Sequence, residues 1–300
     1  MEEDTSADRG KMISVIVPFY NAASTIGAQL EALARQRWSG SWEVICVDNG
    51  STDDTLKIIE KYRDSLPHLR ILEAPTVPTE YHARNVGARA ATGEALLFCD
   101  ADDEVGEGWL AAMAGALSNH DFVACRIDAR KLNKPWVAKG LGASQEKGLQ
   151  TIGFAGPLYY AGGGTMGIKR SLLLDVAGGF DESMWHCGDA MLCIKLQLAG
   201  ATLHFVPDAV LHVRHRVTFQ GIFRQGYGYA KYVTLLYKKS VALGIPKIAH
   251  PWREAIANWR TLLGKFRRTR DKATLVYCIF QLGWQIGLVR GSIKNRVLFL

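Results

Sequence analysis

Cysteine pairs with the spacing of a metal site or a disulfide framework are missing from this sequence. Its six cysteines include no C-x-x-C pair, follow no regular spacing, and mostly lie in apolar runs. This pattern favours buried free thiols in a reducing compartment over disulfides. The first eleven residues, MEEDTSADRGK, also hold no apolar run, so a secretory signal peptide is not expected.

Long hydrophobic runs and phosphate-binding glycine loops are also missing. The longest apolar stretch, residues 275–289, is interrupted by Gln281 and Gln285, and a membrane-spanning helix needs about 20 apolar residues. No Walker sequence occurs, and no glycine-rich loop follows the first apolar run as it does in dinucleotide-binding folds. Any phosphate group that the protein binds must therefore be neutralised in another way.

Acidic residues are scarce in the C-terminal third. Residues 209–300 hold 2 Asp+Glu and 17 Lys+Arg, whereas residues 1–208 hold 27 and 19, so the total of +7 combines −8 with +15. This asymmetry predicts that the C-terminal part meets an anionic partner, either nucleic acid, phospholipid headgroups or a phosphorylated substrate. The 48% hydrophobic content is typical of globular rather than disordered chains.

The first 125 residues alternate apolar runs of strand type with periodic helical segments. This alternation predicts an α/β fold with a mostly parallel sheet flanked by helices. Strands are expected at residues 12–19, 42–49, 69–74, 94–100 and 121–127, and helices at 24–36 and 80–91.

The pattern changes after residue 127. Residues 128–160 lose periodicity and predict a surface loop region. A strand at 165–170, a helical turn at 171–178 and a helix at 190–200 follow, then two strands in 202–215 that break at Pro207. From residue 217 onward the pattern is helical and basic.

Carboxylates stand where two of the early strands end. Asp48 closes the second strand, and Asp100, Asp102 and Asp103 follow the fourth. Ligands of open α/β sheets bind at this edge, and carboxylate oxygens suit Mg²⁺ or Mn²⁺ rather than zinc. The acidic group can alternatively be a solvated turn that caps the next helix.

The first strand ends in PFYN, which includes Pro18, Tyr20 and Asn21. Together with Asp48 and the acidic cluster, this end brings three strand ends around one crevice, for which a nucleotide is the natural occupant. A metal on the acidic cluster, helped by Arg84, would neutralise the diphosphate.

Six segments in this order give a more specific identification. They are PFYN (18–21), VDNGSTDDT (47–55), ARNVGA (83–88), FCDADD (98–103), GGFDE (178–182) and GDAML (188–192). The set resembles the family 2 glycosyltransferases of GT-A fold over residues 12–216. The resemblance implies a nucleotide-activated sugar as donor and a single displacement that inverts the anomeric carbon.

The resemblance also implies roles for individual residues. The loop from Pro18 to Asn21 and Asp48 would contact the nucleobase and ribose, and Arg84 would lie near the diphosphate. Asp100 and Asp102 match the family's D-x-D, in which Asp102 would hold Mn²⁺ or Mg²⁺ with support from Asp103. Asp189 matches the general base that deprotonates the acceptor hydroxyl, although an aspartate there can also simply cap a helix.

This sequence departs from the family in three places. Gly188 stands where the family usually has Glu, and Thr165 stands where it commonly has Asn. Residues 128–160 do not align with the family. These departures concern recognition of the acceptor rather than of the donor.

Several residues have both a functional and a structural interpretation. Trp185 and His186 can line the acceptor site or pack in the core. Gly163 and Gly164, next to Thr165, allow close approach of the backbone to a ligand or form a flexible turn. His212 and His215 can complete the metal or diphosphate site, or they are a surface pair among arginines.

The basic C-terminal region also admits more than one interpretation. LGKFRRTRDK (263–272) and RGSIKNR (290–296) flank the apolar stretch 275–289. The stretch can lie in an anionic membrane interface, or it can pack as an ordinary helix with solvated basic flanks. Nucleic acid is not expected as a partner, because the basic residues lack interleaved stacking aromatics.

The sequence therefore predicts three parts: a disordered segment 1–11, a GT-A domain 12–216 and a basic helical region 217–300. The first hypothesis is an inverting transferase that moves a sugar from a nucleotide sugar, with a UDP-linked donor expected, to a glycan or lipid-linked acceptor. Polysaccharide biosynthesis at the cytoplasmic face of a membrane would suit that activity. The alternatives are a non-catalytic nucleotide-sugar or glycan binding module and a nucleic-acid-associated protein that uses the basic tail.

Overall fold

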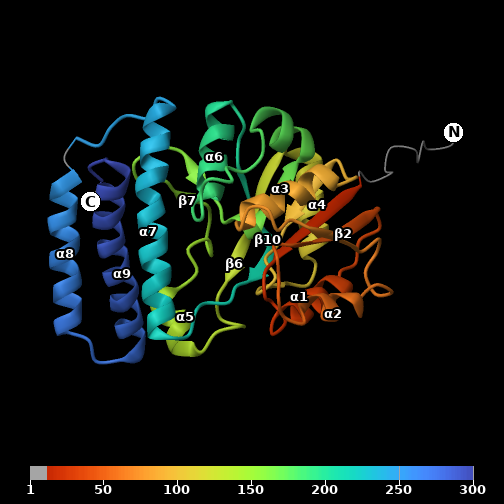
Figure 1. Cartoon of the computed structure of the whole chain (residues 1–300), viewed down its shortest axis with the longest axis horizontal. Helices are drawn as coiled ribbons and strands as arrows, with labels where there is room; N and C mark the ends of the chain where they lie inside the picture. The colour runs from red at the N-terminus through yellow and green to blue at the C-terminus, as the bar shows by residue number, and fades with distance from the viewer. Residues whose placement is uncertain (1–11, 250, 300) are drawn as a thin grey trace. The chain divides into compact units, whose positions relative to one another are not determined.

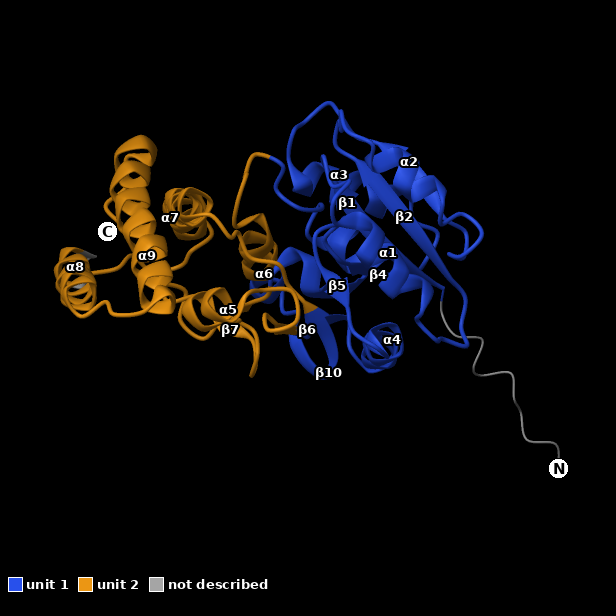
Figure 2. Cartoon of the chain, turned by 90° about the horizontal axis from the view of Figure 1, so that it is seen from below, with its two compact units in different colours: residues 1–126, 162–182, 196–211 blue, residues 127–161, 183–195, 212–300 orange. Residues whose placement is uncertain are grey.

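The computed structural model describes residues 12–249 and 251–299 (Figure 1). The chain packs into two compact units, shown in two colours in Figure 2. Unit 1 comprises the described residues up to 126 together with 162–182 and 196–211, and unit 2 comprises 127–161, 183–195 and the described residues from 212 onward. The predicted disorder of residues 1–11 lies outside the described residues, and the predicted domain boundary after residue 216 stays a prediction.

Unit 1 is built on a mixed, mostly parallel sheet. Its strands are β1 (Ile13–Phe19), β2 (Trp42–Asp48), β3 (Arg70–Glu73), β4 (Ala95–Phe98), β5 (Glu104–Val105), β6 (Phe122–Asp128), β9 (Met166–Lys169) and β10 (His204–His212). Their order in the sheet is β3-β2-β1-β4-β9-β6-β10-β5. Strands β3, β2, β1 and β4 run parallel, and β9 is antiparallel to both β4 and β6.

The central strands form because their sequences are mostly apolar, and the buried Ser14 of β1 donates a hydrogen bond to Glu43 of β2 at 2.7 Å. Every residue of β1 and β2 is buried, as expected for parallel strands that are covered on both faces. The helices of unit 1 are α1 (Ile26–Ala34), α2 (Thr55–Glu60), α3 (Glu80–Ala90) and α4 (Trp109–Asn119). Helix α3 approaches β1 so closely that a Cβ atom at Gly87 would lie 2.6 Å from Ile16 Cγ2, so glycine is required there.

The register of the strands brings their ends to one edge of the sheet. Phe19 pairs with Asp48, so β1 and β2 end side by side, and Ile16 pairs with Phe98 at the end of β4. The acidic segment that begins at Asp100 therefore leaves the sheet next to the PFYN loop. The predicted meeting of three strand ends is confirmed.

The prediction of two strands broken at Pro207 is wrong, because β10 continues through this residue. Pro207 is exposed. Strand β5, the outer neighbour of β10, has only two residues and leaves most of that edge of β10 without a partner strand. Proline lacks an N–H group but is tolerated at such an edge.

Two short helical turns complete unit 1. The 3₁₀ turn η2 (Gly163–Thr165) precedes β9, and η3 (Leu172–Val176), a turn of π-helix, follows it. The predicted helical turn at 171–178 is thus present, as a π-type turn.

Unit 2 is mainly helical. It contains α5 (Pro135–Leu141), the start of α6 (Gly188–Leu198), α7 (Phe219–Ala242), α8 (Pro251–Arg267) and α9 (Lys272–Asn295), with the small strands β7 (Gln150–Thr151) and β8 (Tyr159–Tyr160). The helical pattern predicted after residue 217 is confirmed.

The prediction that residues 128–160 form only a loop is wrong, because they include α5 and the β7–β8 pair. Helix α5 has seven residues, begins with Pro135 and buries Val137, so it is too short to show a helical period. It packs against α9, and a Cβ atom at Gly140 would lie 2.5 Å from the carbonyl oxygen of Ala273.

Helix α9 lies between α7 and α8 in both views (Figures 1 and 2). Glycines bring the backbones of α7 and α9 together: added Cβ atoms at Gly226 and Gly283 would each lie 2.3 Å from a carbonyl oxygen of the facing helix. The apolar stretch 275–289 is part of α9, and Val276, Cys278 and Leu288 are buried. The described helices include none that is both long and apolar enough to cross a membrane.

The expectation of free thiols is confirmed by the structure. All six cysteines are free, and only Cys187 is not buried. Burial raises the pKa of the Cys46 and Cys125 thiols to about 12, so these thiols stay protonated and behave as small apolar groups.

Candidate functional site

The loops after β1 and β2 are linked by hydrogen bonds between residues about 30 positions apart. The backbone N–H of Asn21 donates to Ser51 Oγ at 2.9 Å, and Asn21 Oδ1 accepts from the backbone N–H of Thr52 at 2.8 Å. Asn21 has a φ of 47°, in the left-handed region that asparagine tolerates better than most residues. The asparagine of PFYN is therefore needed for both its backbone conformation and its side-chain oxygen.

Asp48 is the last residue of β2 and directly precedes the loop that contains Ser51 and Thr52. It is only 6% exposed, and its Oδ1 atom accepts from the backbone N–H of Ser51 at 2.8 Å. Its neighbour Asn49 donates from Nδ2 to the carbonyl oxygens of Ala74 and Val77 at 2.6 and 2.9 Å. The segment predicted to bind the nucleobase and ribose is thus held in place by several bonds.

Pro18 and Tyr20 lie on either side of the end of β1. Pro18 is buried within the strand, whereas Tyr20 is 62% exposed just after it. The sequence predicts a nucleotide contact for both residues. The Tyr20 ring is exposed to solvent and the Pro18 side chain is not, and a nucleotide contact for both residues stays a prediction.

Arg84, which is buried, and Asp100, whose side chain is half-buried, form an ion pair in unit 1. Arg84, on α3, is 1% exposed, and its Nη2 atom lies 2.6 Å from Asp100 Oδ1. Its Nη1 atom lies 3.2 Å from Glu80 Oε1. Both arginine and aspartate belong to segments that the sequence analysis assigned to the diphosphate, and the structure brings them into direct contact.

The glycine turn η2 packs directly on this ion pair. A Cβ atom at Gly163 would lie 2.7 Å from Arg84 Nη1, and one at Gly164 would lie 2.6 Å from Asp100 Oδ2. Thr165 closes the turn by donating from Oγ1 to the carbonyl oxygen of Gly162 at 2.7 Å. The glycines are required for packing, and their structural role is to cover the Arg84–Asp100 pair.

Burial and charge act in opposite directions on the two groups. Burial alone would lower the pKa of Arg84, but the carboxylates of Glu80 and Asp100 raise it, so the guanidinium stays charged. Burial raises the pKa of Asp100, and the nearby arginine opposes that rise. The charged guanidinium of Arg84 therefore lies below the glycine turn, beside the carboxyl group of Asp100.

Two glutamines that the sequence analysis did not single out hold the acidic segment. Gln29, fully buried on α1, donates from Nε2 to the carbonyl oxygen of Asp100 at 3.1 Å and accepts from the backbone N–H of Val105 at 2.9 Å. Gln36 donates from Nε2 to the carbonyl oxygen of Gly106 at 2.9 Å, and its Oε1 atom accepts from the backbone N–H of Leu110 at 3.0 Å. Their positions on the buried face of a predicted helix were the available signal.

Asp102 and Asp103, which the sequence predicts to hold a divalent cation, both lie in unit 1. Asp102 is half-buried and Asp103 is 7% exposed. Across residues 12–249 and 251–299, no three His, Cys, Asp or Glu side chains are grouped as a metal cage. One or two carboxylates fit Mg²⁺ or Mn²⁺ nevertheless, because such ions take further oxygen ligands from water and substrate phosphates.

The ARN and GGFDE segments are joined through Asn85. Its Nδ2 atom donates to the Phe180 carbonyl at 2.9 Å and to Glu182 Oε1 at 2.8 Å, and its Oδ1 accepts from the Phe180 N–H at 2.8 Å. His82 Nδ1 lies 2.8 Å from Glu182 Oε2. These bonds fix α3, and with it Arg84, against the segment that follows η3.

The predicted base Asp189 belongs to unit 2, in the first turn of α6. Its Oδ1 atom lies 2.8 Å from the backbone nitrogen of Ala190. Burial raises the pKa of the Tyr160 hydroxyl, and the charge of nearby Asp189 raises it further. Tyr160 donates to Gln150 Oε1 at 2.7 Å. A protonated tyrosine therefore lies close to Asp189.

Aromatic side chains of unit 2 surround His186. The ring centroids of Tyr229 and Tyr232, on α7, lie 5.1 and 5.5 Å from the His186 ring, both edge to face. A Cβ atom at Gly228 would lie 2.8 Å from His186 Nε2. Trp185 is 53% exposed. His186 is thus packed against α7, and Trp185 offers an open aromatic face.

His215 is tied to the loop after α5, within unit 2. Its Nε2 atom lies 2.8 Å from the carbonyl oxygen of Gly142, and its backbone N–H donates to Asn133 Oδ1 at 2.7 Å. Burial lowers the pKa of His215, so the ring tends to be neutral. His212 ends β10, three residues earlier. The structure gives His215 a role in holding this loop.

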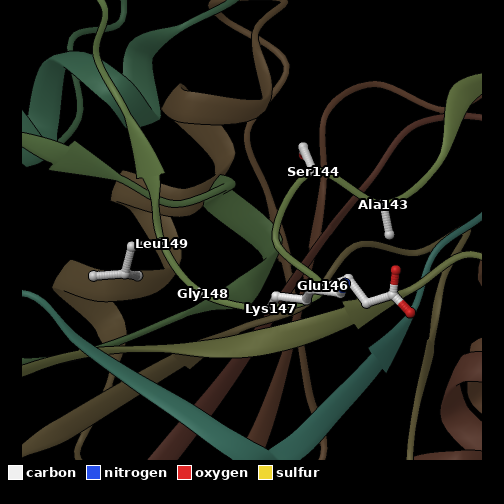
Figure 3. Close-up of a pocket in the computed structure, with 6 residues that line it drawn as sticks. All are labelled: Ala143, Ser144, Glu146, Lys147, Gly148 and Leu149. Carbon is white, nitrogen blue, oxygen red and sulfur yellow. The ribbon is translucent and has the colours of Figure 1, made fainter.

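An open hollow of about 400 Å³ lies in the loop after α5 (Figure 3). It is lined by Ala143, Ser144, Glu146, Lys147, Gly148 and Leu149. None of the predicted site residues lines this hollow, and it brings together no set of groups suited to a sugar or a nucleotide.

Comparison with known sequences finds a family match that covers most of unit 1. Residues 14–176, more than half of the chain, match the family described as glycosyl transferase family 2. The Escherichia coli K12 protein named uncharacterized glycosyltransferase YibD is 40% identical over 93 residues, which are 31% of this chain and 26% of that protein.

A PGL/p-HBAD biosynthesis glycosyltransferase of Mycobacterium bovis is 37% identical over 129 residues, 42% of this chain and 50% of that protein. The chain therefore spans half or less of the length of these two curated relatives.

Solved structures share the fold over nearly the whole chain. The mannosyltransferase PcManGT of Pyrobaculum calidifontis, in complex with GDP-Man and Mn²⁺, is 23% identical with a TM-score of 0.64, covering 95% of this chain and 86% of that one. Staphylococcus aureus TarS 1–349 in complex with UDP-GlcNAc is 20% identical with a TM-score of 0.56, covering 96% and 93%. The predicted GT-A fold class is confirmed by these likenesses.

Proposed function

The chain belongs to glycosyl transferase family 2, and from this premise we propose that it transfers a sugar from a nucleotide-diphosphate sugar to a hydroxyl group. The acceptor that we propose is a glycan or a lipid-linked saccharide, and the reaction inverts the anomeric carbon. The observation that carries the proposal is the linked pair of loops after β1 and β2, which places Asp48 and Tyr20 at the edge where ligands of such sheets bind.

In the proposed donor site, the Tyr20 ring stacks on the nucleobase and Asp48 accepts hydrogen bonds from the ribose. The Arg84–Asp100 pair lies next to the segment that carries Asp102. Mn²⁺ or Mg²⁺ held by Asp102, with support from Asp103, would stabilise the negative charge of the diphosphate as it leaves. Neighbours with bound GDP-Man and UDP-GlcNAc support a nucleotide sugar as donor, and we favour UDP as the nucleotide.

In the proposed transfer step, Asp189 takes the proton of the acceptor hydroxyl while its oxygen attacks the anomeric carbon. The new oxygen–carbon bond forms as the bond between the anomeric carbon and the diphosphate oxygen breaks, and the nucleoside diphosphate leaves with that electron pair. A carboxylate side chain suits a base, and a positioned base of this kind contributes about 10²–10⁴-fold to the rate. Trp185 supplies an aromatic face for the acceptor sugar ring.

His212 and His215 have a weaker place in this proposal. The contact of His215 with Gly142 gives it a structural role. His212, at the end of β10, is the better candidate for contact with the diphosphate or its cation. Location at the cytoplasmic face of a membrane stays part of the proposal.

The experiment that tests the donor site is a thermal-shift panel of UDP-, GDP- and dTDP-sugars with and without Mn²⁺. A donor that binds the folded protein raises its melting temperature, and stabilisation is about 2.7 kcal/mol at 100 times the dissociation constant. We expect a metal-dependent shift with one nucleotide, lost in Asp102→Ala. Asp208→Ala, which removes an exposed carboxylate of β10, is the matched control.

Hydrolysis or transfer of the selected nucleotide sugar separates an enzyme from a binding module. Turnover that needs both the cation and Asp102 supports the proposed transferase. Binding of the nucleotide without turnover, over a panel of glycan and lipid-linked acceptors, would favour the non-catalytic module instead. Absence of any nucleotide-dependent shift would contradict both.

A further inference from the structure

Helix α8 of unit 2 carries a row of large apolar side chains in contact with solvent. Trp252, Ile256 and Leu263 are 49%, 46% and 55% exposed. Their spacings of four and seven residues place them on one face of the helix. Several large apolar groups in one exposed row mark a contact surface, whereas single exposed apolar residues do not.

A row of arginines borders the apolar row. Arg253, Arg260 and Arg267 are all exposed and recur every seven residues. Arg260 and Arg267 each follow an apolar residue of the first row by four positions, which makes them neighbours on the helix surface. The guanidinium carbon of Arg253 lies 5.4 Å from the centre of the Trp252 ring. We call these six residues the α8 face.

Another side of α8 attaches the helix to α9. Leu262 is 4% exposed, and Lys265 Nζ lies 3.8 Å from the centre of the Tyr277 ring on α9. The two helices run side by side in both views of unit 2 (Figures 1 and 2). Since Lys265 contacts α9 and Leu262 is buried, neither belonging to the α8 face, that face can meet a partner while the helix stays packed in its unit.

The charge of this region selects the kind of partner. Residues 209–300 carry 17 Lys+Arg and 2 Asp+Glu, so a cationic field surrounds the α8 face. A helix with an apolar row, a tryptophan and a border of arginines is typical of peripheral binding to anionic lipid. Each cation near such a surface strengthens binding by about fivefold.

We propose that the α8 face binds the headgroup region of an anionic lipid bilayer, with Trp252, Ile256 and Leu263 inserted among the headgroups and the three arginines at lipid phosphates. The helix of 17 residues would lie along the surface over about 25 Å. This assignment differs from the expectation for residues 275–289, of which Val276, Cys278 and Leu288 are buried. Helix α9 also exposes Ile286, Val289 and Ile293, so the test includes variants on α9. The assignment to α8 does not depend on the proposed transferase activity.

The test is cosedimentation of the full chain with vesicles of phosphatidylglycerol and phosphatidylcholine, compared with vesicles of phosphatidylcholine alone. We expect binding to the anionic vesicles that weakens several-fold when ionic strength rises from about 0.05 to about 0.5 M, since salt screens the arginines. Equal binding to both kinds of vesicle, or none to either, would overturn the proposal.

Two variants of the α8 face test its two rows separately. Ile256→Ser with Leu263→Ser removes apolar surface, and we expect a loss of at least about tenfold in the partition coefficient. Arg253→Gln, Arg260→Gln and Arg267→Gln together remove three charges, and the expected loss is also at least about tenfold. Circular dichroism and a melting curve establish that each variant is folded.

Matched controls lie in unit 1 and on α9. Val176→Ser changes a residue that is 55% exposed, as Leu263 is. The combined variant Arg35→Gln, Arg37→Gln and Lys61→Gln removes three positive charges from exposed positions of unit 1, as many as the arginine variant of α8 does. Both controls should bind vesicles as the unchanged protein does. A loss with the controls as large as with the α8 variants, or a loss only with Val289→Ser and Ile293→Ser on α9, would overturn the assignment to α8.

Discussion

The two compact units differ in where their charged groups lie. In unit 1, Glu43 and Arg84 are almost fully buried, and each is held by at least two polar partners. In unit 2, the arginines of α8 are exposed and form rows along the helix surface. Buried, bonded charges keep one position and suit recognition of a particular ligand, whereas exposed cations suit a diffuse anionic surface.

The units also differ in how their elements approach one another. Mostly apolar, buried strands with helices packed on them build unit 1. Glycines at the α7–α9 contact build the centre of unit 2, where backbones meet without intervening side chains. We therefore expect the stability of unit 1 to respond most to the loss of buried polar partners. The stability of unit 2 should respond most to added side-chain volume at the α7–α9 contact.

The largest effect is expected on the transfer rate, from a substitution of the predicted base that leaves donor binding unchanged. Asp189→Asn in unit 2 should lower the transfer rate by about 10²–10⁴-fold, because the amide cannot accept the acceptor proton. Binding of the nucleotide with Mn²⁺ should be unchanged by calorimetry. Asp102→Ala in unit 1 should instead weaken metal-dependent binding. Transfer at the original rate in Asp189→Asn would remove this residue from the mechanism.

The next largest effect is expected on stability, from the loss of the ion pair between Arg84 and Asp100. Arg84→Ala removes a fully buried side chain and leaves Asp100 without its cation, so the free energy of unfolding should fall by about 3 kcal/mol in urea denaturation. Arg89→Ala is the control on the same helix, because its side chain is 54% exposed and lies 3.9 Å from Glu182. A change below about 1 kcal/mol is expected there. Similar losses in both variants would contradict the special role of Arg84.

A smaller effect is expected from two glycines of unit 2. A Cβ atom at Gly287 would lie 2.4 Å from the carbonyl oxygen of Tyr227, so Gly287→Ala should lower stability by about 1–3 kcal/mol. Gly264 on α8 has no atom within 4 Å of the added Cβ, so Gly264→Ala should raise stability by up to about 1 kcal/mol. Thermal unfolding of both variants checks the signs, and a rise for Gly287→Ala would refute the close packing of α7 and α9.

The smallest expected effect is the dependence on pH of the stability that Glu43 contributes to unit 1. Burial would raise the pKa of Glu43, but hydrogen bonds from Thr92, Ser14 and Arg70 lower it below 4.5. The stability from this carboxylate is therefore present above pH 4.5 and is lost as pH falls through the lowered pKa of the folded state.

Glu43→Gln should thus cost about 1 kcal/mol at pH 7. The difference from the unchanged protein should shrink when urea denaturation is repeated at about pH 3.5, where the unfolded carboxyl is protonated. A difference that stays constant with pH would show that the charge of Glu43 contributes nothing.

Much of unit 1 could be predicted because its signals are local. The apolar runs of β1, β2, β4 and β6 and the period of α1 and α3 reveal their type in the sequence itself. Asp48 and Asp100 follow such runs, so their meeting at one edge of the sheet followed from the parallel arrangement. The predictions for 128–160 and Pro207 were wrong because α5 is too short to show a period and β10 tolerates proline at an open edge.

The residues that hold the site could not be predicted in the same way. Gln29 contacts the backbone of Asp100, 71 positions away, and Asn85 contacts Glu182, 97 positions away. Neither contact leaves a pattern in neighbouring residues. Only the position of Gln29 on the buried face of a helix hinted that its amide needs partners.

The sequence by itself determined the family, the α/β fold of unit 1, the strand-end carboxylates and the basic character of the C-terminal third. Runs, periods and short motifs carry that information because they depend on neighbours in the chain. Only the tertiary structure decided that Gly163 and Gly164 cover the Arg84–Asp100 pair, and that Trp252, Ile256 and Leu263 of α8 stay exposed. These outcomes depend on how closely segments that are distant in the sequence pack against each other, and local sequence patterns do not contain that information.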